Sequence, residues 1–172
     1  KDSNAMAIAT VDSQGFPSNR IVLLKAVENN ELIFFTNYGS AKGQDLLNNP
    51  VVSALFFWRE QERQVRINGV VSKLGKQESA TYFENRPYLS QIGAAASNQS
   101  NPIESRAALE NKFEKFRDTF PEGTHVPMPQ DWGGYLIKPL KFEFWQGREG
   151  RLHDRLVFTS DQNGWDMHRL QP

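Results

Sequence analysis

Hydrophobic and polar positions alternate along several short stretches of the chain, and this period of two predicts β-strands. Turn-forming Gly, Asn, Asp and Pro residues separate the stretches. The predicted strands are 5–12, 20–27, 32–37, 51–58 and 63–73 near the start of the chain, and 134–137, 141–146, 151–160 and 165–170 near its end. Tight turns join the first three strands, so we expect them to form an antiparallel meander.

The middle of the chain shows the helical period instead. Predicted helices occupy 40–48, 76–85, 90–96 and 105–120, and Ser40 is a suitable N-cap for the first of them. The last helix carries one apolar stripe, formed by Leu109, Phe113, Phe116 and Phe120. Strands at both ends with helices between them predict a mainly β protein, a closed antiparallel barrel of Greek-key type with a helical insertion, as one domain over residues 1–172.

Composition narrows the class of protein. With 38% hydrophobic residues among 172, the chain is expected to build a real core. Its 20 basic and 20 acidic residues cancel, which argues against a nucleic-acid partner. No membrane-spanning run or signal peptide is present, which fits a cytoplasmic protein. The chain begins at Lys1 and soon enters a predicted strand, so we expect a further segment ahead of it.

Several kinds of chemistry have no support in the sequence. The chain contains no cysteine, and its three histidines are too far apart to form a metal-ligand motif, so no metal site is expected. Hydrolase and nucleotide-triphosphate motifs are also missing from the sequence. Cationic groups, hydroxyl groups and aromatic rings remain, and this combination suits a phosphorylated aromatic cofactor that performs the difficult chemistry itself.

Residues 144–155 hold the densest set of charged and aromatic side chains. Alternate residues of a strand point to the same face, so Arg151, His153 and Arg155 are expected to share one face. Two arginines and a histidine repel one another unless an anionic or planar group lies over them. The alternative is a solvated edge strand, and the spacing alone does not decide between the two interpretations.

A second set of cationic and hydroxyl residues lies in the first half of the chain. Ser40 and Lys42 open a helix, where free N–H groups and the helix dipole favour an anion, although an ordinary capped helix is the alternative. Arg20 and Lys25 have an odd spacing and face opposite sides of their strand unless a bulge intervenes. Gln64 lies near the start of a strand, and there the alternative is an exposed strand end.

A third set follows in the predicted helices and the strand near the end. Tyr82, Arg86 and Ser90 recur every four residues and could line one wall of a pocket or be polar caps at a helix end. Gln99 and Ser100 follow the small residues 93–97, which permit close approach of the backbone to a helix or to a flat ligand. Trp145 either packs on a planar ring or fills the core.

Nine short motifs follow one another along the chain: 20–25 (RIVLLK), 35–36 (FT), 39–42 (GSAK), 62–65 (ERQV), 86–87 (RP), 90–93 (SQIG), 99–100 (QS), 144–147 (FWQG) and 151–155 (RLHDR). They occur in the order seen in pyridoxine (pyridoxamine) 5′-phosphate oxidase, and the chain resembles this family over nearly its whole length. The closing residues 169–172 (RLQP) also resemble the end of the family. Each motif alone is weak, whereas the ordered series is specific.

The resemblance implies a fold, a cofactor and a reaction. The family has an FMN-binding split-barrel fold and works as a homodimer, with FMN at the subunit interface. It oxidises pyridoxamine 5′-phosphate or pyridoxine 5′-phosphate to pyridoxal 5′-phosphate, and O2 then reoxidises the flavin and yields H2O2. As a hypothesis, a hydride passes to the flavin from the substrate carbon that bears the amine or the alcohol.

The resemblance also implies roles for individual residues. One subunit would bind FMN through Arg20, Ile21, Val22, Leu23, Leu24, Lys25, Phe35, Thr36, the position of Ala41, Lys42 and Gln64. The other subunit would complete the FMN site with Gln99, Ser100, Trp145 and Arg155. The substrate phosphate would be held by Lys25, Tyr82, Arg86 and Ser90. Arg151 and His153 would cover the substrate ring, away from the flavin, as the catalytic pair.

Two positions depart from the family pattern. Ala41 stands where the family usually has Arg, so one phosphate contact is lost and weaker FMN binding is expected. Phe35 stands where Tyr is common, and the loss of that hydroxyl is expected to matter little.

Three rival interpretations share the same fold: an FMN-dependent oxidase of the phenazine-biosynthesis type, a non-catalytic flavin- or haem-binding protein, and a purely structural dimerising barrel. Lys25 and Arg86 favour the vitamin B6 enzyme because they would recognise the substrate phosphate. Arg151 and His153 argue against a non-catalytic protein, which needs no second cationic clamp.

Overall fold

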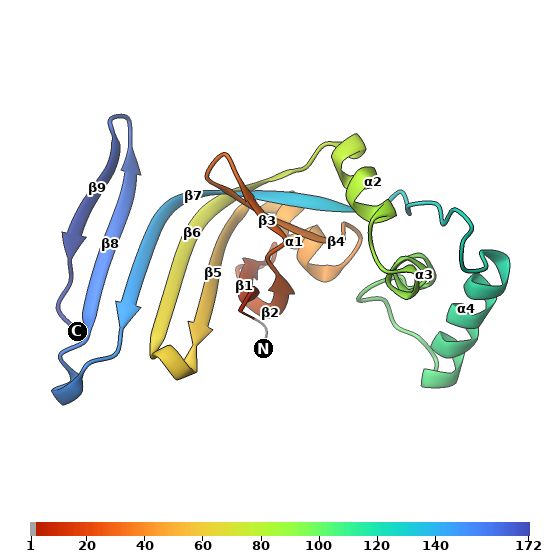
Figure 1. Ribbon diagram of the computed structural model, residues 1–172, viewed down its shortest axis with the longest axis horizontal. Coiled ribbons are helices and arrows are strands. Elements are labelled where there is room, and N and C mark those ends of the chain that lie inside the picture. Colours follow the sequence, from red (N-terminus) through yellow and green to blue (C-terminus); the bar gives the residue numbers. More distant parts are fainter. Residues whose placement is uncertain (1–2) are drawn as a thin grey trace. The chain divides into compact units, whose positions relative to one another are not determined.

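The computed structural model describes residues 3–172, and Figure 1 labels its elements. The strands are β1 (Ala5–Val11), β2 (Pro17–Leu23), β3 (Ala26–Glu28), β4 (Glu31–Asn37), β5 (Val51–Trp58), β6 (Arg63–Lys73), β7 (Trp132–Gln146), β8 (Asp154–Asp161) and β9 (Gly164–Arg169). The helices are α1 (Ala41–Asn48), α2 (Lys76–Glu84), α3 (Tyr88–Ala96) and α4 (Arg106–Thr119), with short 3₁₀ turns η1 (Arg59–Gln61) and η2 (Glu149–Arg151).

Within the described residues, the strands form one sheet in the order β2-β1-β5-β6-β7-β4-β3, with β8 beside β7 and β9 beside β8. The recorded pairings are antiparallel, as in β1 with β2, β5 with β6 and β7 with β8. Three of the helices, α2 to α4, lie between β6 and β7 in the chain. The predicted mainly β architecture with a helical insertion is therefore confirmed.

The predicted meander of the first three strands is confirmed in its consecutive pairs, β1 with β2 and β3 with β4, but its middle strand is not continuous. β1 pairs with β2 and with β5, whereas β4 pairs with β3 and follows β7 in the strand order. The predicted strand 20–27 is interrupted after Leu23, because the backbone N–H groups of Leu24 and Lys25 donate to Asn4 O and Ile33 O, at 2.8 Å each. Its two halves, β2 and β3, therefore pair with different neighbours.

The two strands predicted at 134–137 and 141–146 are one long strand, β7. Pro139 lies in its middle, in the gap between the two predicted strands. A proline cannot donate to the ladder, but it can occupy a strand where its missing N–H is not needed. The strand therefore continues through the proline and pairs with β8 over Lys141–Gln146.

Contacts divide the chain into two compact units. The first consists of the chain up to Phe34 with Asp45–Ser72 and Leu136–Pro172. The second consists of Phe35–Gln44 and Lys73–Tyr135. Boundaries between the units fall inside β4, α1 and β7, so each of these elements contributes to both. The single domain expected over 1–172 stays a prediction.

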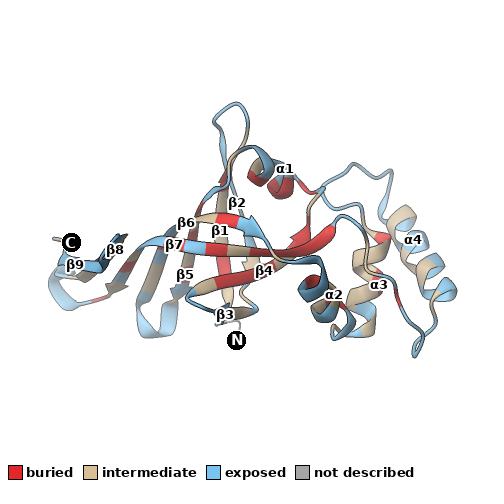
Figure 2. Cartoon of the chain, turned by 90° about the horizontal axis from the view of Figure 1, so that it is seen from above, coloured by how far each residue is buried: buried red, intermediate tan, exposed pale blue. Residues whose placement is uncertain are grey.

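The core of the first unit is built from alternate residues of its strands. Met6 and Ile8 of β1 are fully buried, and the residues beside them on that strand are half-buried. Phe34 is fully buried as well, and Val52 and Ala54 repeat the same alternation on β5. Figure 2 shows the buried positions recurring along these strands, as expected for strands that cover a core with one face.

The core of the second unit is a cluster of Phe83, Ile92, Val126 and Trp132. The predicted apolar stripe of α4 packs against it through Phe113, Phe116 and Phe120. In the small-residue run of α3, Ala94 and Ala95 pack against the same cluster, and the side chain nearest to Gly93 is Phe113 of α4. Of the two partners considered for this run, the structure thus shows a helix.

Candidate active site

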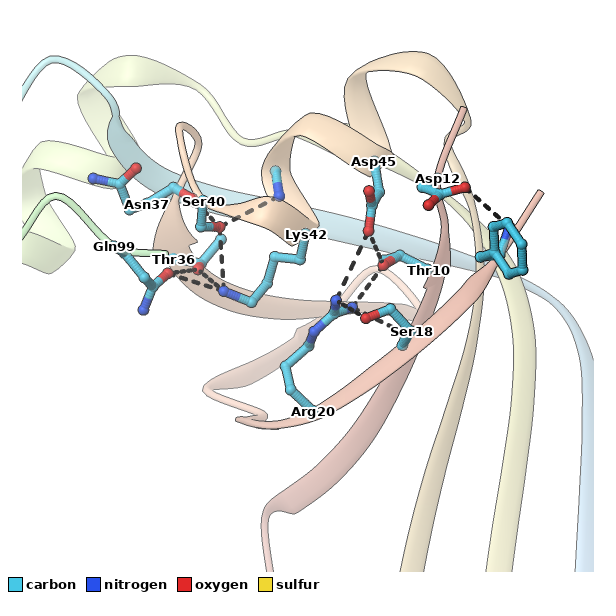
Figure 3. A network of polar contacts seen from close by, with 12 residues as sticks. Thr10, Asp12, Ser18, Arg20, Thr36, Asn37, Ser40, Lys42, Asp45 and Gln99 are labelled. Carbon is cyan, nitrogen blue, oxygen red and sulfur yellow. Dashed lines mark hydrogen bonds and ion pairs between the residues drawn. The ribbon is translucent and has the colours of Figure 1, made fainter. Parts of the chain in front are cut away.

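Lys42, the second residue of α1, lies with its ammonium group among three oxygen atoms (Figure 3). Nζ donates to Thr36 Oγ1 at 2.9 Å, to Ser40 Oγ at 3.2 Å and to Gln99 Oε1 at 2.9 Å. The residue is only 7% exposed. Ser40 Oγ also accepts a hydrogen bond from the N–H of Gly43 at 3.3 Å, which confirms Ser40 as the helix cap. A buried cation at the start of a helix provides a suitable anchor for an anionic group.

Gln99 reaches this cluster from its own chain. Its Oε1 accepts a second hydrogen bond, from Thr36 Oγ1 at 3.0 Å. The resemblance implies that Gln99 serves the site of the partner subunit, yet here it contacts two predicted FMN residues, Thr36 and Lys42, within one protomer. The exposed Ser100 follows in a turn with a left-handed φ of 72°. Both residues of the predicted pair therefore lie in one exposed turn, and Gln99 is the one that contacts Thr36 and Lys42.

Phe35, Tyr82 and Trp132 form a stack of nearly parallel rings in the second unit. The ring centroids of Phe35 and Tyr82 are 3.7 Å apart with an angle of 6° between planes, and those of Phe35 and Trp132 are 5.3 Å apart with an angle of 11°. The stack brings a predicted FMN position, Phe35, against a predicted substrate residue, Tyr82. Sequence reasoning gave Trp132 no role, because it follows the proline-rich loop directly and stands before the predicted strand.

Arg86 is in the short connection between α2 and α3, and its guanidinium lies over two aromatic rings. Its guanidinium carbon is 4.8 Å from the ring centroid of Trp132 and 5.6 Å from that of Phe83. Among the described residues, its buried Nη1 atom has no hydrogen-bond partner. Burial lowers the pKa of this guanidinium from its usual value, and the nearby Tyr82 partly opposes that change. A buried donor without a partner costs free energy, so this atom fits an anionic ligand that supplies the missing acceptor.

Arg20 of β2 lies in another polar cluster, in the first unit (Figure 3). Its Nη1 donates to Thr10 Oγ1 at 2.6 Å and its Nη2 to Ser18 Oγ at 3.0 Å. Asp45 Oδ2 is 3.8 Å from Nη2 and also accepts from Thr10 Oγ1 at 2.5 Å. Burial lowers the pKa of Arg20, whereas the charge of Asp45 raises it. The sequence gave no sign of this support by Thr10 and Asp45.

The remaining predicted positions of the 20–25 motif are mostly open to solvent. Ile21 is 65% exposed, Leu23 is 41% exposed and Lys25 is exposed as well, whereas Val22 and Leu24 are half-buried.

The predicted FMN positions Gln64 and Ala41 differ in burial. Gln64 is half-buried on β6 opposite Phe57, and Ala41 is exposed as the first residue of α1. Ser90, a predicted substrate residue, is half-buried on α3.

Trp145 and Arg155 are directly opposite each other in the β7–β8 ladder. Alternation along β7 puts Glu143 on the same face as Trp145, and Arg155 binds this carboxylate. The Nε and Nη2 atoms of Arg155 each lie 2.8 Å from Glu143 Oε1. Arg66 of β6 donates to the other oxygen at 3.1 Å. Sequence reasoning missed Glu143, although its place two residues before Trp145 on a strand was a usable signal.

The prediction that Arg151, His153 and Arg155 share one strand face is wrong. β8 begins only at Asp154, and Arg151 ends the 3₁₀ turn η2. Gly150 and Arg151 both have left-handed φ angles, of 65° and 61°. Two consecutive residues in this region turn the backbone too sharply for a strand. Only Arg155 therefore has the strand geometry that the alternation predicted.

His153 nevertheless lies next to a predicted FMN residue. Its ring centroid is 4.7 Å from that of Trp145. The backbone N–H of Arg148 donates to His153 Nδ1 at 3.1 Å. Because Nδ1 accepts a hydrogen bond, the neutral imidazole carries its proton on Nε2, which is the nitrogen left to contact a ligand.

Asp154 links the turn before β8 to the end of β9, because it binds one arginine from each. It accepts from Arg148 Nε at 2.8 Å, and Arg169 near the end of the chain donates to its other oxygen. The hydrogen bonds from Arg148 and Arg169 lower the pKa of Asp154 below its usual value. The residue that follows the catalytic candidates is thereby fixed by two arginines.

Among residues 3–172, no group of three or more His, Cys, Asp or Glu side chains is placed to hold a metal ion. No helix in this part of the chain is long and apolar enough to cross a membrane.

The chain is similar to known proteins over nearly its whole length. Residues 1–120 match the model of the family described as pyridoxamine 5′-phosphate oxidase, and residues 132–172 match a pyridoxine 5′-phosphate oxidase C-terminal dimerisation region. The pyridoxine/pyridoxamine 5′-phosphate oxidase of Leptospira biflexa is 52% identical over 171 residues, which are 99% of this chain and 80% of the relative. The enzyme of the same name from Bordetella avium is 54% identical over 172 residues, again 99% of this chain and 80% of the relative.

Solved structures show the same fold. PhzG from Burkholderia lata, in complex with tetrahydrophenazine-1-carboxylic acid, superposes with a TM-score of 0.94 at 31% identity, covering 100% of this chain and 84% of its own. A pyridoxamine 5′-phosphate oxidase-related, FMN-binding protein from Nostoc punctiforme has a TM-score of 0.79 at 16% identity, covering 99% of this chain and 88% of its own. The latter similarity concerns the fold alone.

The strand order, together with the cationic and aromatic side chains described above, defines a flavin-binding split-barrel protein of the oxidoreductase class. The chain belongs to the pyridoxamine 5′-phosphate oxidase family. This confirms the family that the ordered motifs predicted, and with it the expected enzyme class and FMN as the cofactor. The dimerisation region at 132–172 also indicates a homodimer.

Proposed function

We propose that the chain is an FMN-dependent oxidase that converts pyridoxamine 5′-phosphate or pyridoxine 5′-phosphate to pyridoxal 5′-phosphate, with O2 as the electron acceptor and H2O2 as the second product. Relatives about half identical over nearly the whole chain carry the corresponding name. The observation that carries the proposal is Arg86, whose buried Nη1 lacks a partner among the described residues. A phosphate monoester supplies charged acceptor oxygens of the kind that this guanidinium needs.

FMN binding is assigned to two groups of side chains. In the second unit, Lys42 with Thr36, Ser40 and Gln99 forms a polar cradle in which the ammonium group is oriented by three oxygens. These oxygens take up the three N–H donors of the ammonium group, so the phosphate of FMN would be bound by its charge and by exchange of one of these hydrogen bonds. In the first unit, Trp145 offers an aromatic face and Arg155 a fixed guanidinium. Arg20, Gln64, Ser100 and the backbone of residues 21–25 are proposed to complete the binding of FMN.

Substrate binding is assigned to Lys25, Tyr82, Arg86 and Ser90 for the phosphate and to Arg151 and His153 for the ring. Arg86 is already oriented by Trp132 and Phe83, so little side-chain entropy is lost when the phosphate binds. Two FMN sites at the interface of a homodimer, in the cytoplasm, complete the proposal. The matched dimerisation region supports the dimeric part of it.

Bound FMN supplies the hydride acceptor for oxidation of the carbon that bears the amine or the alcohol. The protein's task is to hold the phosphate and the ring so that this carbon lies in position to react. Arg86 holds the phosphate as a fixed anchor. Arg151 neutralises negative charge on the substrate ring. His153 donates from Nε2 to an oxygen substituent of the pyridine ring, because its Nδ1 already accepts from the N–H of Arg148.

An anaerobic experiment tests the proposal directly. FMN-loaded protein is mixed with pyridoxamine 5′-phosphate, and the flavin absorbance is followed before and after admission of air. Bleaching that air reverses, with formation of pyridoxal 5′-phosphate and H2O2, is the expected result. A flavin that stays oxidised with both B6 phosphates would contradict the proposal, and reduction by a phenazine precursor instead would favour the activity class of PhzG.

A further inference from the structure

Glu143 is a buried carboxylate with two cationic partners. It lies on β7, is 5% exposed and belongs to the first unit, as do both partners. Arg155 of β8 approaches one oxygen with Nε and Nη2, each at 2.8 Å, and Arg66 of β6 donates to the other at 3.1 Å. The neighbouring strands on both sides of β7 thus each supply one arginine, and the carboxylate between the two cations offsets their repulsion.

The hydrogen bonds of Arg155 fix the orientation of its guanidinium plane. A guanidinium has five N–H donors in a planar fork. One donor on Nε and one on Nη2 point to Glu143, and Nη1 donates to the backbone oxygen of Gln171 at 3.1 Å. The remaining N–H donors are on Nη1 and Nη2, the pair that binds an acceptor in a bidentate way.

The last residues of the chain bind the first two residues of β8, Asp154 and Arg155. The backbone N–H of Leu170 donates to Arg155 O at 2.9 Å, and Arg169 binds the carboxylate of Asp154. Gln171 then reaches the Arg155 side chain with its carbonyl oxygen. Both the backbone and the side chain of Arg155 are thereby restrained, and Glu143 supplies the one charged partner of its guanidinium in the recorded contacts.

We propose that Glu143 is a positioning residue for FMN binding: it holds the Arg155 guanidinium, together with the carbonyl of Gln171, so that the free donors of Nη1 and Nη2 face the cofactor. The inference rests on the proposed function, in which Arg155 binds FMN. Glu143 itself does not touch the cofactor in this proposal. Without its charge, Arg155 gains rotamer freedom and the repulsion from Arg66 is no longer balanced.

The test measures the FMN affinity of the apoprotein by quenching of flavin fluorescence, so it does not depend on turnover. Glu143→Gln keeps the shape of the side chain and removes its charge. We expect FMN to bind about tenfold more weakly, the loss typical of one charge-assisted hydrogen bond. Arg66→Gln is the matched control because it removes the other partner of Glu143 and leaves Arg155 bound. We expect its FMN affinity to stay within about twofold of the parent protein, a change well below that of one charge-assisted bond.

A second comparison separates positioning from a general structural role. In an Arg155→Ala background, Glu143→Gln is expected to cause no further loss of FMN affinity, because the two residues act as one unit. Losses that add would overturn the proposal, and so would an unchanged affinity in Glu143→Gln alone. If Arg155→Ala itself binds FMN normally, the assignment of Arg155 under the proposed function fails first. Should Glu143→Gln not fold, Glu143→Asp, which keeps the charge but withdraws it by one methylene, is expected to weaken FMN binding in the same direction, and normal binding would count against the proposal.

Discussion

The guanidinium carbon of Arg86 lies 4.8 Å from the ring centroid of Trp132, while its buried Nη1 has no hydrogen-bond partner within the described residues. Replacement by Gln removes the charge and leaves the aromatic surroundings. We expect Arg86→Gln to raise KM for pyridoxamine 5′-phosphate by about 10- to 100-fold, because a charge-assisted hydrogen bond contributes about 1.5–3 kcal/mol. Steady-state kinetics check this expectation.

The control for Arg86 is Arg117→Gln, which removes an exposed arginine that pairs with Glu114 on α4. Its KM is expected to remain that of the parent protein. A KM for Arg86→Gln that equals the control value would show that Arg86 does not hold the substrate phosphate. Unchanged FMN affinity in both variants would confine the effect to the substrate.

Ala41 is the exposed first residue of α1, one position before Lys42. Introducing arginine there adds a cation at the start of a helix whose buried lysine is proposed to bind the FMN phosphate. We expect Ala41→Arg to bind FMN about tenfold more tightly, which corresponds to about 1.4 kcal/mol. Fluorescence titration of the apoprotein measures the affinity, with Ala41→Gln as a neutral control of similar length. Equal affinities for the Arg and Gln variants would refute a phosphate contact at this position.

His153 accepts a hydrogen bond at Nδ1 from the N–H of Arg148 at 3.1 Å. A glutamine amide extends to about the position of Nε2, whereas an asparagine amide reaches only that of Nδ1. We therefore expect His153→Gln to retain clearly more activity than His153→Asn, with a difference of about tenfold in kcat/KM, since one donor contact to the ligand is worth about 1 kcal/mol or more. Nitrogen chemical shifts of labelled His153 provide an independent check, because the neutral ring should be protonated on Nε2. A ring protonated on Nδ1, or equal activity of the two variants, would contradict this assignment.

Asp154 has its pKa lowered by hydrogen bonds from Arg148 and Arg169. When the folded-state pKa lies below the unfolded value of about 3.9, ionisation stabilises the fold above that value, and the contribution is lost as the pH falls through the folded pKa. We expect Asp154→Asn to unfold at a lower temperature than the parent at pH 7, by a small amount because the ion pairs are exposed. The difference should begin to shrink as the pH falls below about 3.9 and should disappear only below the lowered pKa of the folded state.

Thermal unfolding at a series of pH values measures this effect, with Asp118→Asn on the exposed face of α4 as the control. A stability difference that persists unchanged in strong acid would mean that Asp154 acts through shape and not through charge.

Much of the fold could be predicted from the sequence because local signals and burial agree there. The strands β1, β5 and β6 and the helix α4 lie close to their predicted bounds. The failures occur where tertiary contacts override a local signal. Pro139 is tolerated inside β7, and the break after Leu23 depends on partners elsewhere in the chain, Asn4 and Ile33. No property of residues 20–27 alone reveals those partners.

The candidate site was predictable in its residue types and less so in its geometry. The motif series named Lys42, Arg86 and Arg155, which the structure shows held by specific contacts. It could not show that Arg151 has left-handed φ, because a period of two in the sequence does not distinguish a strand from a tight turn. Glu143 and Trp132 were missed because their importance comes from cross-strand and stacking neighbours.

The long strand β7 has a consequence for how the protein is made. β4 lies between β7 and β3 in the sheet, so it can pair only with β3 until β7 leaves the ribosome roughly a hundred residues later. At about 5–20 residues per second this interval lasts about 5–20 s, during which one edge of β4 has no partner strand. Unpaired strand edges promote aggregation. Chaperones that cover this edge during synthesis should therefore raise the yield of folded protein.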